Sequence, residues 1–88
     1  MKIVLNKCYG GFSLSEEACE YLGCKSSYRY SAYEERSNPD LVRCVEELGA
    51  RANGKFARLE VVEIPDGANY EIFEYDGIET AVEVGHYW

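Results

Sequence analysis

The dipeptide Asp76-Gly77, set between two β-rich segments, constrains the fold of this 88-residue chain more than any other feature. Asp-Gly is a preferred two-residue hairpin turn, because both residues accept positive φ angles. Residues 69–75 (NYEIFEY) alternate before it, and residues 78–84 (IETAVEV) are predicted to return as the second strand, although the spacing of Ile78 and Val82 also suits a short helix. In residues 69–75, Tyr70 and Ile72 are predicted to lie on one face of the strand, and Phe73 and Tyr75 on the other face.

Two further segments are predicted to be strands. Residues 56–64 (FARLEVVEI) are rich in β-forming side chains and end at the turn signal Pro65-Asp66-Gly67. Residues 2–8 contain the short apolar run Ile-Val-Leu and stop at two glycines. We expect the last three strands of the chain to form an antiparallel meander.

Two helices are expected between the first and second strands. The first starts at a capping box, Ser13-Leu-Ser-Glu16, and stops at Gly23. The second starts with Asn38-Pro39 and stops at Asn53-Gly54, with Gly49 as an earlier stop. The apolar faces are Leu14, Ala18 and Leu22 in the first, and Leu41, Val45, Leu48 and Ala52 in the second.

Residues 24–37 (CKSSYRYSAYEERS) are compatible with either a strand or an ordered loop. With no linker or internal repeat, residues 1–88 are predicted to be a single domain. The predicted fold is α+β, in the order β-α-(loop)-α-β-β-β, with an antiparallel sheet and two helices packed on one face.

Charge is unevenly divided along the chain. All nine Lys and Arg residues lie at or before Arg58, so residues 59–88 carry eight acidic side chains and neither Lys nor Arg. This acidic third repels phosphate backbones, and nucleic-acid binding is not expected. The acidic third is either a solvated face that favours solubility, or a surface for a basic partner or a neighbouring subunit's basic half.

Composition indicates a soluble, cytoplasmic protein. Apolar residues make up 47% of the chain, which is too many for a disordered segment. No apolar run approaches the roughly 20 residues of a membrane span, and the start MKIVLNK lacks a secretory signal. We therefore expect free thiols, with no zinc-site spacing, at Cys8, Cys19, Cys24 and Cys44.

The pair Gly10-Gly11 raises the question of a ligand site. It is either a turn that needs positive φ, or an anion cradle in front of a helix start. As a cradle it would bind a phosphate-bearing, nucleotide-like small molecule, with arginines on the phosphate and tyrosines stacked on a ring. Surface ion pairs with the acidic third are the alternative for the arginines. The candidate residues are Gly10, Gly11, Phe12, Ser13, Tyr28, Arg29, Tyr30 and Arg36.

The alternative functional site is the acidic sheet itself. It would bind a basic surface on another protein and inhibit that protein. The candidate residues are Glu71, Glu74, Asp76, Glu79 and Trp88.

Catalysis and metal binding are not expected. The single histidine, His86, is one of the last three residues and would meet Cys8 only if strand one and the carboxy terminus touch. Acidic side chains that could ligate a metal lack EF-hand spacing; they are Glu60, Glu63, Asp66 and Asp76. We therefore predict a binding protein that is no enzyme and has no cofactor.

Three segments, "MKIVLNKCYGGFSLSEEA", "NPDLVRCVEELGARANGKFARLEVVEIPDG" and "YEIFEYDGIETAVEVGHYW", resemble a family of small proteins encoded by bacteriophages and prophages. The resemblance covers the chain apart from residues 24–37. One departure is Asn38-Pro39, where the family pattern has Asp-Pro, and either residue can cap a helix.

The resemblance implies an accessory protein in the cytoplasm of an infected bacterium. Such a protein would sequester a small molecule, for example a nucleotide signal of host immunity, or inhibit a host protein. A homodimer is also expected, because a chain this short gains stability from association.

Overall fold

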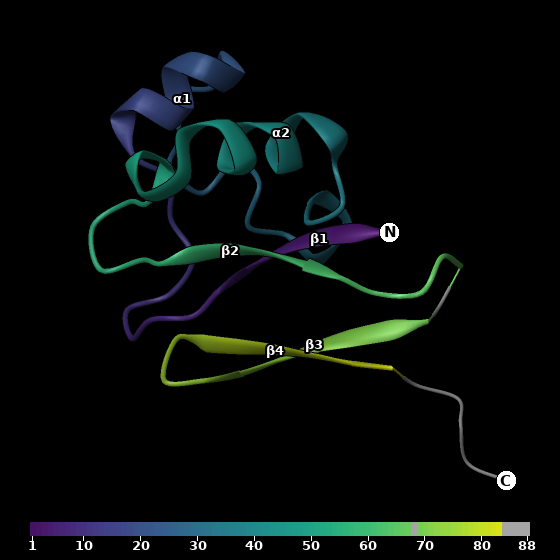
Figure 1. Ribbon diagram of the computed structural model, residues 1–88. Helices are drawn as coiled ribbons and strands as arrows, with labels where there is room; N and C mark the ends of the chain where they lie inside the picture. Colours follow the sequence, from purple (N-terminus) through teal and green to yellow (C-terminus); the bar gives the residue numbers. More distant parts are fainter. Residues whose placement is uncertain (68, 84–88) are drawn as a thin grey trace, which may run out of the picture.

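The computed structural model describes residues 1–67 and 69–83 (Figure 1). The order of its elements, and the antiparallel pairing of the described strands, confirm the α+β fold. With η for a 3-10 helix, the elements are β1 (Lys2–Asn6), α1 (Glu16–Leu22), η1 (Tyr33–Glu35), α2 (Pro39–Leu48), η2 (Gly49–Ala52), β2 (Leu59–Glu63), β3 (Tyr70–Tyr75) and β4 (Ile78–Glu83).

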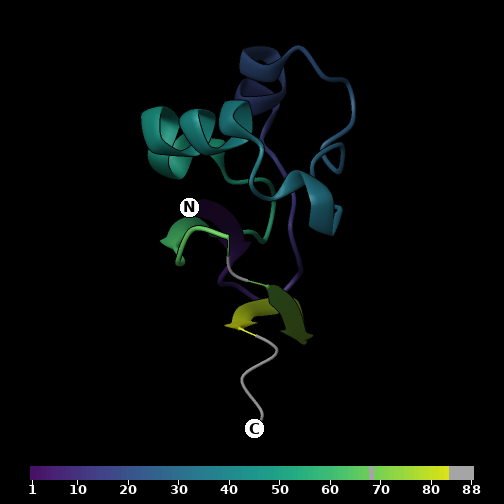
Figure 2. The ribbon, with the colours of Figure 1, turned by 90° about the vertical axis from the view of Figure 1, so that its right-hand side faces the viewer.

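The chain forms three layers, with the strand pair β1–β2 in the middle (Figures 1 and 2). The helices cover one face of this pair, where Val4 of β1 joins their apolar side chains. The hairpin β3–β4 covers the opposite face, where Ile3 and Leu5 meet Tyr70. Strand β1 is therefore buried on both faces, which explains its uninterrupted apolar run.

The last three strands do not form the expected meander. Strand β2 pairs with β1, and β3 pairs with β4. At the end of β2 the Ile64 N–H donates to the Met1 carbonyl at 2.8 Å, and Pro65 has no N–H with which to continue a ladder. The chain then crosses to the other face of β1–β2, because Ile3 and Leu5 need apolar cover there.

The first helix begins two residues later than the predicted capping box. Its N-cap is Ser15, whose hydroxyl accepts the Ala18 N–H at 3.0 Å. Ser13 is instead buried, and its carbonyl accepts the Gly54 N–H at 2.9 Å. The predicted stop at Gly23 is confirmed by its left-handed conformation, with φ of 70°.

The start of the second helix is confirmed. Asn38 is the N-cap and accepts the Asp40 N–H at 2.9 Å, and Pro39 is the first helical residue. Gly49 ends the α-helix, and the chain continues as η2. Residues 24–37 are irregular apart from η1, so the loop alternative is correct.

Strand β2 starts three residues later than predicted, because residues 54–57 form a tight turn. The Ala57 N–H donates to the Gly54 carbonyl at 3.1 Å. Phe56 in this turn has a φ of 65°, a left-handed conformation that is uncommon for a bulky side chain.

Candidate functional site

The loop after β1 meets the β3–β4 turn backbone to backbone, at Gly10, Gly11 and Gly77; we call this contact the glycine junction. A Cβ on Gly77 would lie 2.6 Å from the Gly10 nitrogen and 2.5 Å from the Gly11 nitrogen. A Cβ on Gly10 would lie 2.6 Å from the Phe56 Cβ. Gly10-Gly11 is thus a turn packed between two other turns, which only glycine allows at these distances.

An open hollow of about 450 Å³ lies over the glycine junction. It is lined by the three glycines together with Glu74 and Asp76. Two carboxylates and no Lys or Arg of the described residues line it, so a phosphate there would be repelled. The hollow favours a cationic group.

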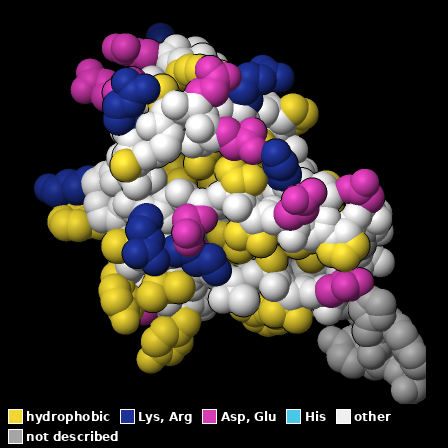
Figure 3. Space-filling view, viewed as in Figure 1, with side chains coloured by type: hydrophobic (Ala, Val, Ile, Leu, Met, Phe, Trp, Pro, Cys, Tyr) yellow, Lys and Arg dark blue, Asp and Glu magenta, His cyan; other side chains and the backbone are white. Residues whose placement is uncertain are grey.

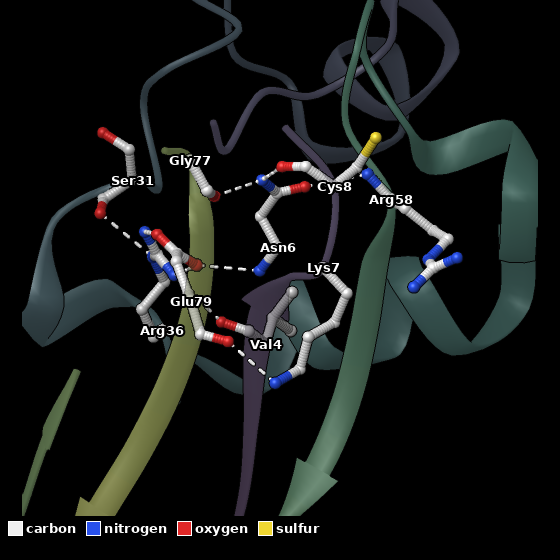
Figure 4. Close-up of polar contacts among 9 residues, drawn as sticks. All are labelled: Val4, Asn6, Lys7, Cys8, Ser31, Arg36, Arg58, Gly77 and Glu79. Carbon is white, nitrogen blue, oxygen red and sulfur yellow. Dashed lines mark hydrogen bonds and ion pairs between the residues drawn. The ribbon is translucent and has the colours of Figure 1, made fainter. Parts of the chain in front are cut away.

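Beneath the junction, Arg36 and Glu79 form a buried ion pair (Figure 4). Their exposed fractions are 4% and 6%. The guanidinium donates two parallel hydrogen bonds to the carboxylate, at 2.6 and 2.7 Å, and lies 4.1 Å from the centre of the Phe12 ring. Its Nε donates to the Ser31 carbonyl at 3.0 Å. Both charges are therefore satisfied inside the protein.

The same ion pair closes the free edge of β1. Alternate residues of β1 bond to β2, which leaves the main-chain groups of Val4 and Asn6 at the other edge. There the Val4 N–H donates to the Arg36 carbonyl at 2.9 Å, and the Val4 carbonyl accepts from the guanidinium at 3.2 Å. The Asn6 N–H donates to the Glu79 carboxylate at 2.7 Å. Arg36, through its main chain and side chain, and the Glu79 carboxylate thus complete an edge that no strand of the described residues covers.

Asn6, which the sequence pattern did not mark, joins the buried pair to the glycine junction (Figure 4). Its fully buried side chain donates to the carbonyls of Cys8 at 2.7 Å and Gly77 at 2.6 Å. Its Oδ1 accepts the Arg58 N–H at 2.8 Å. A polar residue directly after an apolar run is the one sequence signal that could have indicated it.

The structure brings several predicted ligand residues together but encloses them. Phe12, Ser13 and Tyr30 are buried, with exposed fractions of 6%, 8% and 9%. Arg36 forms an ion pair with Glu79 of the acidic third. The alternative prediction for the arginines expected such a pair, but at the surface, whereas this pair lies inside the protein. These four side chains stabilise the fold and present nothing to a surface ligand.

The remaining two predicted ligand residues lie on the surface. Tyr28 is 64% exposed. Arg29 pairs with Glu35 at 3.4 Å and lies 4.9 Å from the centre of the Tyr30 ring. Arg29 is therefore engaged by the loop to which it belongs.

The predicted partner-binding residues are divided between surface and interior. Glu71, Glu74 and Asp76 are exposed, and Asp76 has the positive φ, 56°, that its turn requires. Glu79 is buried, so its place in a binding surface is wrong. The roles considered for Trp88 and His86 concern residues outside the described parts of the chain.

The hairpin turns one face to the core and one to solvent. Cross-strand partners share a face, which places Phe73 with Thr80 and Tyr75 with Ile78 on the outer side. Phe73, Tyr75 and Val82 are 54%, 82% and 40% exposed. The outer hairpin face, as we name it, consists of Glu71, Phe73, Tyr75, Ile78, Thr80 and Val82.

The four cysteines are free thiols, as expected. Burial raises the pKa of Cys44 to about 11, and burial followed by a contact with Cys24 raises the pKa of Cys19 to about 11. Burial also raises the pKa of the Tyr70 hydroxyl. The folded protein therefore holds these protons to higher pH than the unfolded chain does.

The raised pKa values predict a loss of stability at alkaline pH. Between pH 9 and about 11 the unfolded thiols release protons that the folded thiols retain, so the free energy of unfolding falls as pH rises through this window. The midpoints of urea denaturation at neutral pH and above pH 9 measure this loss of stability. The variant Cys44→Ala should start lower but show a shallower alkaline decline; an unchanged decline would exclude Cys44 as a source.

Two kinds of feature are absent from residues 1–67 and 69–83, the described part of the chain. No helix there has the length and apolar character to cross a membrane. No three potential metal ligands of those residues gather at one point.

Comparison with known proteins gives no match: no family model, no curated protein and no solved structure matches the chain. The resemblance to phage and prophage proteins therefore stays a prediction.

Proposed function

We propose that the protein is a binding module, without turnover, that recognises a basic surface of another protein through the outer hairpin face. The observation that supports this most is the exposure of Phe73, Tyr75 and Val82 together on one side of a two-stranded sheet. Exposed apolar side chains gathered on one face are typical of binding surfaces, in which aromatic residues are enriched.

The charge around this face supports a basic partner. Glu71 lies on the face, and Glu74 and Asp76 are exposed at the turn end of the hairpin. No Lys or Arg follows Arg58 in the sequence. A positive partner would be attracted and oriented by these carboxylates, and an acidic partner would be repelled.

The hairpin is held firmly enough to present this face. Tyr33 of η1 stacks on Tyr70, with ring centres 4.9 Å apart, and its hydroxyl donates to the Tyr70 carbonyl. The Lys7 ammonium donates to the Glu79 carbonyl at 2.7 Å. A binding face fixed in advance loses less conformational entropy on association.

A nucleotide-like ligand at Gly10–Ser13, the other function expected from the sequence, has less support. Arg36, one of the two arginines predicted for it, is buried and paired with Glu79, and the hollow over the glycines is lined by carboxylates. If the chain is of phage origin, as the resemblance implies, the partner of the hairpin would be a host protein.

The test is affinity capture from bacterial lysate, followed by measurement of the dissociation constant for the protein captured. We expect Phe73→Ser/Val82→Ser to weaken binding about tenfold or more, because exposed aromatic anchors dominate binding energy. Tyr28→Ser is the matched control, since Tyr28 is also exposed, at 64%, but lies in the loop of residues 24–37 and not on the hairpin. Circular dichroism should show that all variants remain folded.

Equal binding by the double variant and the control would contradict the proposal. So would a monomer–dimer equilibrium in sedimentation that the double variant abolishes, because the face would then belong to a second copy of this chain.

A further inference from the structure

Phe56 combines two unfavourable features, a left-handed backbone conformation and an exposed aromatic ring. It has the left-handed φ of 65° at the third position of the Gly54–Ala57 turn, where glycine or asparagine is preferred. Its side chain is nevertheless 67% exposed, so no core packing repays the strain. A strained, exposed aromatic residue is better explained by a contact with another molecule than by stability.

Phe56 belongs to a group of exposed aromatic residues around the glycine junction. Tyr9 precedes Gly10 and is 63% exposed, and Tyr75 lies two residues before Gly77 and is 82% exposed. Figure 3 shows hydrophobic side chains, in yellow, at the left end of the molecule, where the three turns meet in Figure 1. We name Tyr9, Phe56 and Tyr75 the aromatic end.

The charge of the hollow selects the kind of side chain that it can bind. The hollow among these turns is lined by Glu74 and Asp76 and by no Lys or Arg of the described chain. Carboxylates next to exposed aromatic rings attract a guanidinium or ammonium group. The Lys55 ammonium lies 5.2 Å from the centre of the Phe56 ring, so a partner cation has to displace it or use another part of the ring.

We infer that the aromatic end binds an arginine or lysine side chain of the partner polypeptide, with the cationic group in the hollow between Glu74 and Asp76. This inference rests on the proposed function and names the anchor residue of the partner. Tyr75 belongs both to the aromatic end and to the outer hairpin face. Tyr75 is also next to Glu74 and Asp76 in the sequence, so a partner segment on the outer hairpin face can place a neighbouring basic residue at the turn.

The probe is the peptide acetyl-Gly-Arg-Gly-Arg-Gly-amide, compared with the same peptide carrying neutral citrulline in place of arginine. We expect the arginine peptide, and not the citrulline peptide, to shift the amide resonances of Gly10, Gly11 and Gly77. Glu74→Gln/Asp76→Asn should weaken the shift about tenfold, and asparagine still accepts the φ of Asp76. Glu20→Gln/Glu34→Gln removes the same charge elsewhere on the surface and should change nothing.

A second variant separates function from structure. Phe56→Gly relieves the backbone strain, so the melting temperature should rise by several degrees while peptide binding weakens about tenfold. A lower melting temperature with unchanged binding would overturn the inference and make Phe56 structural. Equal shifts from both peptides would overturn it as well.

The same measurements distinguish this inference from the proposed function. If Phe73→Ser/Val82→Ser loses the captured protein while Phe56→Gly and Glu74→Gln/Asp76→Asn retain it, the hairpin face binds without the aromatic end. If none of these variants changes binding, both are wrong.

Discussion

Replacing Glu79 with alanine is expected to lower the free energy of unfolding by about 3–5 kcal/mol. The substitution leaves the Arg36 guanidinium, which is 4% exposed, without its counter-ion. It also removes the acceptor of the Asn6 N–H at the edge of β1. The free energy of unfolding of a whole domain is only about 5–15 kcal/mol, so this substitution would remove much of the protein's stability.

Urea denaturation followed by circular dichroism measures this effect. Glu74→Ala is the matched control, because Glu74 lies directly across the hairpin from Glu79 but is exposed. We expect the control to change stability by less than about 0.5 kcal/mol. Hydrogen exchange at the Asn6 amide should accelerate in Glu79→Ala and not in the control.

Removing both charges tests the reason for the loss. The double variant Arg36→Met/Glu79→Leu has no unpaired buried charge, so it should recover most of the stability that Glu79→Ala loses. If Glu79→Ala costs no more than Glu74→Ala, the ion pair does not hold the hairpin to β1.

The sequence could predict the elements of the fold because their signals are local. Asn38-Pro39 at the start of α2, Gly23 at the end of α1 and Asp76-Gly77 between β3 and β4 each act within a few residues. Their conformational preferences do not depend on the rest of the chain.

The pairing of the strands could not be predicted in the same way. An apolar run such as Ile3–Leu5 indicates a strand covered on both faces, but not which segments cover it. Strand β4 shows the difficulty most clearly, because apolar Ile78 and Val82 face outward while Glu79 faces inward. Hydrophobic alternation alone assigns the opposite orientation to this strand.

The arrangement of the candidate site could not be predicted from the sequence for a related reason. Glu79 resembles Glu71 and Glu74 in sequence, and only its pairing with Arg36, 43 residues earlier, makes it structural. Gly10-Gly11 resembles a ligand loop until the backbone of Gly77 is seen packed against it. Contacts between residues so far apart in sequence leave no local pattern.

The glycine junction provides the second large effect, through Gly77→Ala. A Cβ at this position would lie 2.5–2.6 Å from the Gly10 and Gly11 nitrogens, and the φ of 91° is unfavourable for alanine. Strain and overpacking together should cost about 2–4 kcal/mol, measured by urea denaturation.

Gly67→Ala is the matched control for this variant. Gly67 also has a positive φ, 76°, but a Cβ there would meet no atom within 4 Å. It should therefore show the backbone cost alone, about 1–2 kcal/mol. The difference between the two variants measures how tightly the hairpin turn is packed on the loop after β1. Equal losses would mean that the turn can move away from Gly10-Gly11. The glycines that line the hollow assigned to a basic side chain would then not be held in a fixed arrangement.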